Sequence, residues 1–338
     1  VGCGEKPQAK ANGRQHPAAL THGRKPRNII FMVSDGMSAG VPTLAEPFAQ
    51  LTRGRGTHWE KLMRDADASH GQLLTRSLNS LVTDSAAASS AWGSGSRVNN
   101  GVLNVLPDGT KLVPIATLLS NHGKRVGLVT TDVVNGGTPA GFAAVNESRN
   151  EYEDIAKQVQ GSVDVLMGGG MKYFDPLARK DQLDLIGLYQ KDGYEFVSDR
   201  EAILGRPSAG RGKVLGLFND AQMPYTIDHL NSARLRRTTP TLAEMTRYAL
   251  QALSQHRDGF FIMVEGARID HAAHANDIAG EMWEQLAFDD AVGEAVDFIK
   301  HRDDTLLVVT TDHGNANPGL CGMGSRYADS TQTFEKIK

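Results

Sequence analysis

The chain alternates between two kinds of hydrophobic pattern. Six short runs are almost continuously apolar and rich in β-branched residues, whereas longer segments between them place apolar residues three or four positions apart. Continuous apolarity is typical of strands covered on both faces, and the wider spacing is typical of helices. The runs lie at residues 28–33, 125–130, 163–168, 213–218, 259–264 and 305–310. Strands that alternate with helices predict an α/β fold with a large, mainly parallel central sheet sandwiched by helices.

Two segments have the clearest helical pattern. Residues 240–256 follow Thr239, a suitable N-cap, and Pro240 would occupy the first helical position. Residues 276–300 repeat apolar side chains at intervals of three and four. Residues 171–240 are less regular, and we expect loops and insertions there. Because no internal repeat or clear linker is present, we expect one domain over residues 27–338.

Composition and charge narrow the class of protein. With 338 residues, 40% of them hydrophobic, the chain can bury the core of one large domain or of two at most. A formal net charge of −3, without a long basic run, argues against nucleic acid as a specific partner. The sequence contains no apolar run of about 18 residues, the length that spans a membrane.

The beginning of the chain differs from the rest. Residues 1–26 are polar, rich in glycine and proline, and without periodicity, so we expect a flexible leader. The opening "VGC" resembles the end of a bacterial lipoprotein signal, which implies a lipid anchor at Cys3 and a periplasmic, cell-surface or secreted location. The alternative is an ordinary tail. The second cysteine, Cys321, is too distant in sequence to form a C-x-x-C zinc or redox pair with Cys3.

Candidate functional residues follow three of the predicted strands. In open parallel sheets, ligands bind beyond the carboxyl ends of the strands. Asp35 follows the first run, and Glu265, Asp270 and His274 follow the fifth. The adjacent pair Asp312 and His313 follows the last run. We therefore expect these side chains to converge on one edge of the sheet.

The same residues have the chemistry of metal ligands. If a helix begins near Asp270, this residue and His274 are spaced i and i+4 on one helical face, so both could reach one ion. Asp312 and His313 offer an oxygen and a nitrogen ligand, and Asp35 offers another oxygen. This mixture of hard oxygens and borderline nitrogens suits Zn²⁺, with Mg²⁺ nearby.

A second group of residues could act on an anion. Ser85 precedes the helix-forming "AAASSAW" and would lie at a helix N-terminus, where N–H groups and the helix dipole favour negative charge. A metal there could ionise the hydroxyl for attack on phosphorus. The segment 130–156 adds Thr138 and Arg149, and the planar guanidinium matches two phosphate oxygens.

A serine hydrolase is a competing hypothesis. Gly36-Met-Ser-Ala-Gly40 matches the G-x-S-x-G nucleophile elbow, with Ser38 as the nucleophile. The triad would then require the neighbours Asp312 and His313, whose side chains point to different sides of one strand end. The elbow also leaves the other candidate residues unused, so we expect Asp35, and not Ser38, to be the working residue.

Five strings resemble one known family. "VSDGMS", "TDSAAA", "GGTPAGFAAV", "EGARIDHAAHAND" and "TTDHGN" are similar to alkaline phosphatase in order and spacing, from about residue 28 to about residue 320. The resemblance implies a phosphate monoester hydrolase with two zinc ions and one magnesium ion. It also implies small phosphate monoesters and inorganic phosphate as ligands, and a homodimer.

The resemblance assigns the zinc ligands residue by residue. Asp270 and His274 would bind the first zinc, and Asp312 and His313 would bind the second. Asp35 would bridge the second zinc and the magnesium. The two zinc ions would clamp the attacking and leaving oxygens, and the first would activate the water that hydrolyses the intermediate.

The remaining roles also follow from the resemblance. Thr138 and Glu265 would complete the magnesium site. Ser85 would be the nucleophile and form a phosphoserine, Arg149 would bind the phosphate, and His271 would contact the phosphate through water.

Two departures from the family pattern limit this assignment. The first zinc of the family takes a further histidine, and this chain contains no residue that matches it, so we expect a catalytic domain that lacks its C-terminal part. Gly136 stands two positions before Thr138, where many relatives have Asp or His near the magnesium, and water would take that place. Two alternatives therefore stay open, a phosphodiesterase or sulfatase of the same superfamily and a metal- or phosphate-binding protein without turnover.

Overall fold

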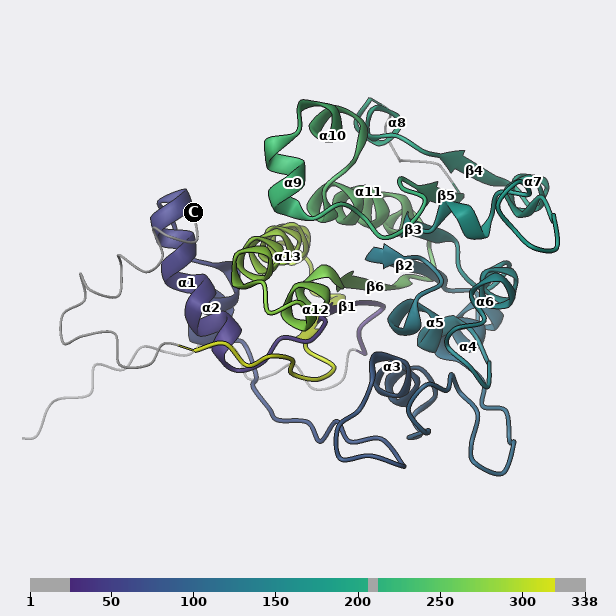
Figure 1. The fold of residues 1–338 in the computed structure, drawn as a ribbon, viewed down its shortest axis with the longest axis horizontal. Coiled ribbons are helices and arrows are strands. Elements are labelled where there is room, and N and C mark those ends of the chain that lie inside the picture. Colours follow the sequence, from purple (N-terminus) through teal and green to yellow (C-terminus); the bar gives the residue numbers. More distant parts are fainter. Residues whose placement is uncertain (1–24, 206–211, 320–338) are drawn as a thin grey trace, which may run out of the picture.

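The protein is a parallel α/β sandwich, described by a computed structural model for residues 25–205 and 212–319 (Figure 1). In these residues seven strands form one sheet in the order β4-β5-β3-β2-β6-β1-β7, and every pairing is parallel. The strands are β1 (Asn28–Ser34), β2 (Arg125–Val133), β3 (Val165–Gly169), β4 (Tyr194–Val197), β5 (Lys213–Leu217), β6 (Phe260–Gly266) and β7 (Thr305–Thr310). The mainly parallel sheet that the apolar runs predict is confirmed. Cys3, Cys321 and nearly all of the expected leader lie outside the described residues.

Helices cover both faces of the sheet (Figure 1). They are α1 (Gly40–Arg53), α2 (His58–Arg64), α3 (Ser85–Ser94), α4 (Ile115–Asn121), α5 (Gly137–Ala143), α6 (Tyr152–Val159), α7 (Leu185–Lys191), α8 (Arg200–Leu204), α9 (Thr226–Asn231), α10 (Ala233–Thr238), α11 (Leu242–Ser254), α12 (Arg268–His274) and α13 (Ile278–Ile299), with a 3₁₀ turn η1 at Met171–Tyr173. Among the described helices, none has the length and apolarity needed to cross a membrane.

Two details of the sequence prediction are wrong. The segment 171–240, expected to be less regular, contains strand β4 and helices α7 to α10. Strand β4 has no continuous apolar run, because it is a four-residue edge strand with only its first and last residues buried. The N-cap of α11 is Thr241, and not Thr239. The Thr241 hydroxyl accepts the Glu244 N–H, while the Glu244 carboxylate accepts the Thr241 N–H, and this capping box moves the helix start past Pro240. The predicted helix 276–300 is confirmed as α13.

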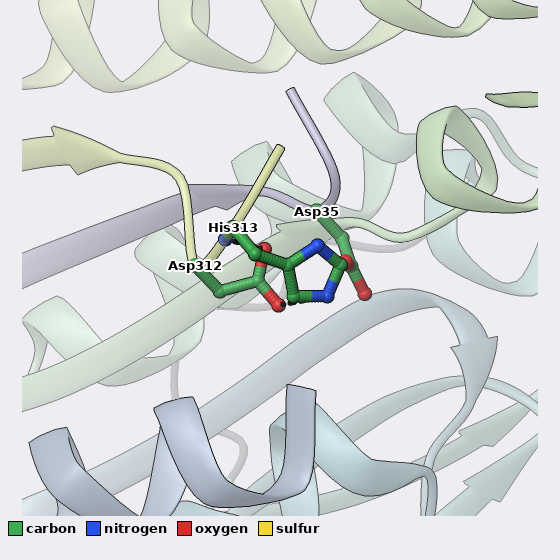
Figure 2. Close-up of side chains that lie close together, drawn as sticks. All are labelled: Asp35, Asp312 and His313. Carbon is green, nitrogen blue, oxygen red and sulfur yellow. Dashed lines mark hydrogen bonds and ion pairs between the residues drawn. The ribbon is translucent and has the colours of Figure 1, made fainter. Parts of the chain in front are cut away.

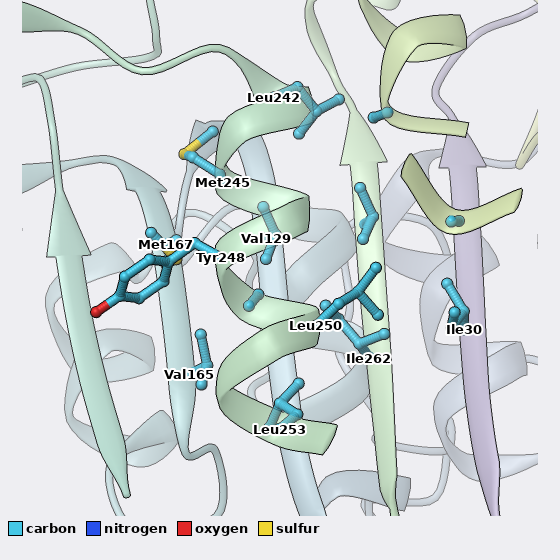
Figure 3. Packing of buried hydrophobic residues seen from close by; sticks show 14 of the residues in the cluster. Ile30, Val129, Val165, Met167, Leu242, Met245, Tyr248, Leu250, Leu253 and Ile262 are labelled. Atoms are coloured by element: carbon cyan, nitrogen blue, oxygen red, sulfur yellow. The ribbon is translucent and has the colours of Figure 1, made fainter. Parts of the chain in front are cut away.

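The core lies on both faces of the sheet, as the continuous apolar runs require. Ile262 and Val264 of β6 pack with α11 and α13, whereas Phe261 and Met263 of the same strand belong to the cluster on the opposite face. Figure 3 shows the first of these clusters, where Leu250 of α11 lies beside Ile262. Packing on both faces fixes the position and register of β6, and its carboxyl end is held rigidly.

Helices α3 and α5 approach each other closely through small residues. A Cβ atom on Gly141 would lie 2.0 Å from the Ser89 Oγ, and one on Gly93 would lie 2.1 Å from the Gly141 carbonyl oxygen. The Ser89 hydroxyl donates to the carbonyl of Gly137, which is in α5, at 3.0 Å. This contact joins the helix that begins with Ser85 to the helix that contains Thr138.

We expect Gly141→Ala to destabilise the protein. Alanine has the better helix propensity by about 1 kcal/mol, but overpacking of a close contact costs about 1–3 kcal/mol, and the overlap with Ser89 involves backbone as well as side chain. Denaturant unfolding should show a net loss of stability. The matched control is Gly71→Ala, where a Cβ would meet nothing within 4 Å, and an equal effect in both variants would contradict this explanation.

Candidate active site

Four adjacent strands deliver the candidate residues to one edge of the sheet. In the order β2-β6-β1-β7, Glu265 lies within β6, opposite Val33 of β1 and Thr130 of β2. Asp35 follows the end of β1, and Asp312 and His313 follow the end of β7. Because all these strands run in the same direction, their carboxyl ends meet. The structure thus confirms that these side chains, distant in sequence, converge.

Asp35, Asp312 and His313 form a compact cluster (Figure 2). One potential ligand atom from each lies within 4.8 Å of the others, and His313 Nε2 lies 3.3 Å from Asp312 Oδ2 and 3.6 Å from Asp35 Oδ1. Asp312 Oδ1 accepts the N–H groups of Gly36 and His313, at 3.1 and 2.8 Å. Asp312 Oδ2 and Asp35 Oδ1 are buried without a hydrogen bond in the described part of the chain. Two such carboxylates and an imidazole fit a zinc-type cation.

The electrostatics of the cluster also fit a cation. Burial, followed by the charges of Asp312, Asp270 and Glu265, raises the pKa of Asp35 well above its ordinary value. Several carboxylates in a dry site repel one another, and a bound cation would reverse this effect.

Ser85 lies beside this cluster at the start of α3. Asp84 is the N-cap of the helix, and its Oδ1 accepts the Ala87 N–H at 2.9 Å. The buried Ser85 Oγ is 3.3 Å from His313 Nε2 and 3.4 Å from Asp35 Oδ2. The structure therefore brings the predicted nucleophile into contact with two of the predicted metal ligands.

Arg149 is held next to Ser85 by Asp84. Its Nη1 donates to Asp84 Oδ2 at 3.0 Å, and the same oxygen accepts the Gly101 N–H at 2.9 Å. Burial lowers the pKa of Arg149, but Asp84, Asp35 and Tyr152 together raise it by more, so the guanidinium stays charged. No role for Asp84 was predicted from the sequence, although an aspartate before a helix-forming run is itself an N-cap signal.

Glu265 and Thr138 form a second polar group at this edge. Glu265 Oε2 accepts the Thr130 hydroxyl at 2.5 Å. Burial, followed by the charge of Asp132, raises the pKa of Glu265 to about 8, although the Thr130 and Thr138 hydroxyls lower it. The Thr138 hydroxyl is buried and makes no hydrogen bond of good geometry within the described residues. A carboxylate beside an unsatisfied hydroxyl fits a hard cation such as Mg²⁺.

We expect the metal-free protein to lose stability as the pH rises from about 4.5 to about 8. Over this range folded Glu265 keeps a proton that the unfolded chain has released, so the folded state binds more protons and is penalised by rising pH. The loss should be of the order of a few kcal/mol. Denaturant unfolding in chelator at several pH values measures it. Glu265→Gln should reduce the slope without abolishing it, because burial also raises the pKa of Glu281 and of Glu284 to about 7, and an unchanged slope in that variant would assign the effect to those groups.

Asp270 and His274 come together on α12, as the i, i+4 spacing predicts. Asp270 Oδ2 lies 3.3 Å from His274 Nε2, and Asp270 Oδ1 accepts the Asn315 amide at 2.8 Å. The His274 side chain is 70% exposed. Within residues 25–205 and 212–319, no third histidine, cysteine or carboxylate ligand atom lies within 4.8 Å of both members of this pair.

Two further sequence candidates make no hydrogen bond or ion pair with the cluster in the described residues. His271 Nδ1 lies 2.9 Å from Arg268 Nη1, and burial lowers the pKa of His271. The hydroxyl of Ser38 is buried without a hydrogen bond among the described residues, while His313 contacts Ser85. The structure thus gives no support to a triad based on Ser38.

The fold and the cluster define a class, the parallel α/β proteins with a group of metal-ligand side chains at the carboxyl edge of the sheet. A family model described as "Alkaline phosphatase" matches residues 26–334. The chain belongs to the alkaline phosphatase family, as its sequence strings indicate.

Individual relatives agree with this assignment. Alkaline phosphatase 4 of Bacillus subtilis is 34% identical over 92% of this chain and 66% of its own length. The crystal structure of Thermus thermophilus alkaline phosphatase has a TM-score of 0.87 and 37% identity, covering 94% of this chain and 65% of that one. A histidine-to-glutamate variant of alkaline phosphatase from the bacterium TAB5, "with Mg bound in the M3 site", has a TM-score of 0.72 and 30% identity, covering 86% and 79%. The chain spans about two thirds of the length of the first two relatives.

Proposed function

We propose that the protein hydrolyses phosphate monoesters and that Ser85 is the nucleophile. One observation carries the proposal, the position of the Ser85 hydroxyl, 3.3 Å from His313 and 3.4 Å from Asp35, in a cluster where Asp35 Oδ1 and Asp312 Oδ2 lack hydrogen-bond partners among the described residues. A phosphorus atom bound next to Ser85 would be attacked by a hydroxyl that the N-cap Asp84 and the contact between α3 and α5 hold in place.

Three cation sites are part of the proposal. Asp35, Asp312 and His313 would hold one zinc ion, Asp270 and His274 a second, and Asp35, Thr138 and Glu265 a magnesium ion. When bound, these cations would favour the serine alkoxide and neutralise the charge of the phosphoryl group. The unsatisfied oxygens of Asp312 and Thr138 support the assignment, as does the magnesium bound by the TAB5 relative.

Arg149 and His271 would orient the phosphate. Because Arg149 Nη1 is fixed by Asp84, the guanidinium would present its other N–H groups to two phosphate oxygens. A monoester has three non-bridging oxygens, so two can pair with Arg149 while the third faces a cation, whereas a diester has only two; this favours monoesters over diesters. His271 is proposed to contact the phosphate through water.

Turnover of an aryl phosphate tests the proposal. We expect hydrolysis that a chelator abolishes and that zinc with magnesium restores. Preferred turnover of a bis-aryl phosphodiester or an aryl sulfate would instead support a different member of the superfamily. Tight binding of inorganic phosphate without turnover of any of these esters would support a binding protein.

Arg149→Ala should chiefly weaken phosphate binding. Loss of charge-assisted hydrogen bonds worth about 1.5–3 kcal/mol should raise the inhibition constant of inorganic phosphate by about 10- to 100-fold. Arg125→Ala is the matched control, because Arg125 pairs with Asp164 at the opposite end of β2. This control should lose stability and retain phosphate affinity. An unchanged inhibition constant in Arg149→Ala would remove Arg149 from the site.

Two further proposals concern the protein in the cell. We propose that it acts in the periplasm or at the cell surface, or is secreted, with a lipid on Cys3, and that it forms a homodimer. The "VGC" sequence supports the first proposal, and the family resemblance supports the second. Detergent partitioning of the expressed protein against Cys3→Ser tests the anchor, and sedimentation equilibrium tests the dimer.

A further inference from the structure

Gly136 leaves a space that another side chain of the chain fills. It is the N-cap of α5, with φ −67° and ψ 171°, a conformation that any residue adopts. The backbone therefore does not require glycine at this position. A Cβ atom on residue 136 would lie 2.4 Å from Asp132 Oδ2. A side chain at position 136 would force the Asp132 carboxylate to move, because that carboxylate occupies the space beside Gly136 where water was expected.

The Asp132 carboxylate is directed at the Glu265 and Thr138 group. Of all the charged neighbours of Glu265, Asp132 acts on it most strongly. Asp132 Oδ1 is buried and has no hydrogen-bond partner among the described residues. No ion pair of Asp132 with a lysine or arginine is found in the described part of the chain. Two carboxylates therefore repel each other near the ends of β2 and β6, and among the described residues neither lysine nor arginine pairs with Asp132.

A separate observation points to a ligand at this place. The Thr138 side chain is 2% exposed, lies beside Glu265, and has a hydroxyl without a hydrogen bond of good geometry in the described residues. An unsatisfied hydroxyl and an unsatisfied carboxylate oxygen beside a second, buried carboxylate are costly unless a cation or ordered water joins them.

We propose that Asp132 belongs to the magnesium site, where it supplies, directly or through a bound water, the carboxylate that Gly136 lacks. The inference rests on the proposed function, because it adds a residue to one of the three proposed cation sites. Asp132, Glu265 and Thr138 would each offer the cation an oxygen atom. Oxygen ligands without nitrogen or sulfur favour Mg²⁺ over Zn²⁺. The site therefore selects magnesium, while the cluster with His313 takes zinc.

Magnesium binding to Asp132→Asn tests the proposal. Titration calorimetry of the full chain, loaded with zinc beforehand, should show magnesium affinity reduced at least about 10-fold. This is the loss of metal affinity typical when a residue of a metal site or its surroundings is replaced. Zinc content should be unchanged. Asp108→Asn, which removes an exposed carboxylate remote from the sheet edge, is the control and should bind magnesium like the parent.

A paired exchange gives a sharper result. Gly136→Asp alone should destabilise the protein, because its Cβ meets the Asp132 carboxylate. Combined with Asp132→Ala, the same substitution has room, and the double variant should recover magnesium affinity to within about 10-fold of the parent. Asp132→Ala alone should not. Recovery shows that the two positions serve one cation, which a purely structural role for Asp132 would not produce.

The outcomes separate this inference from the proposed function. Unchanged magnesium affinity in Asp132→Asn, with loss of affinity in Glu265→Gln, would overturn the role of Asp132 and leave the proposed function intact. If Asp132→Asn loses magnesium affinity but the parent chain hydrolyses no phosphate ester, the magnesium site is supported and the proposed function is overturned.

Discussion

A Ser85→Ala variant is expected to hydrolyse aryl phosphate at least about 10³-fold more slowly than the parent chain, because the attacking oxygen is removed. Cation binding should be retained, since Ser85 lies beside the cluster and the cluster keeps its three ligand side chains. After incubation with labelled inorganic phosphate at acid pH, the parent should carry label on protein, and the variant should carry none. Label that persists in the variant would identify another nucleophile.

Ser38→Ala is the matched control for this experiment. Ser38 is also a buried serine near the end of β1, but its hydroxyl makes no hydrogen bond in the described residues, so its removal should change activity and stability little. A loss of esterase activity in Ser38→Ala, with retention in Ser85→Ala, would revive the serine hydrolase hypothesis.

Asp312→Asn should have opposite effects on cation binding and on metal-free stability. The amide oxygen can still accept the N–H groups of Gly36 and His313, so the local fold is kept. The amide nitrogen replaces the unsatisfied Oδ2 and can donate to a neighbouring carboxylate. Zinc affinity should fall at least about 100-fold and activity with it. In chelator, the variant should unfold at a higher denaturant concentration than the parent, because one buried charge is gone.

Asp164→Asn distinguishes this effect from a general effect on buried aspartates. Asp164 is buried at the other end of the sheet, where it pairs with Arg125 and accepts the Val126 N–H. Removing its charge leaves Arg125 unpaired, so this variant should lose stability and keep its zinc. Equal stability changes in the two variants would contradict the assignment of Asp312 to a cation.

The fold was predictable wherever burial dictates the residue type. Five of the seven strands in the described residues lie between neighbouring strands and are mostly buried, and their continuous apolar runs follow from that position. Strand β7 has such a run although it forms one edge and is only partly buried, whereas β4, at the other edge, has no run, and Glu195 and Phe196 are only partly buried. The start of α11 was also ambiguous, since Thr239 and Thr241 both flank Pro240 and only the contact with Glu244 decides between them.

The candidate site was predictable to the extent that strand ends reveal it. Asp35, Asp312 and His313 follow apolar runs directly, and parallel pairing brings such positions together. Asp132 lies inside the β2 segment, and nothing in the local sequence shows that its side chain fills the space beside Gly136. The contact of Asp84 with Arg149 was also not predictable, because the two residues are 65 positions apart in the sequence. Long-range packing therefore determines the position of Asp132 beside Gly136 and the pairing of Asp84 with Arg149.

The position of β6 has a consequence for the newly synthesised chain. Strand β1 pairs with β6 and β7 among the described strands, and both are made more than 200 residues later. Strand β1, the first of the described strands in the chain, is thus left without neighbours while β2, β3, β4 and β5 can already associate. We expect the nascent chain to expose both edges of β1 until β6 and β7 have been made, so this strand would be a target for chaperones.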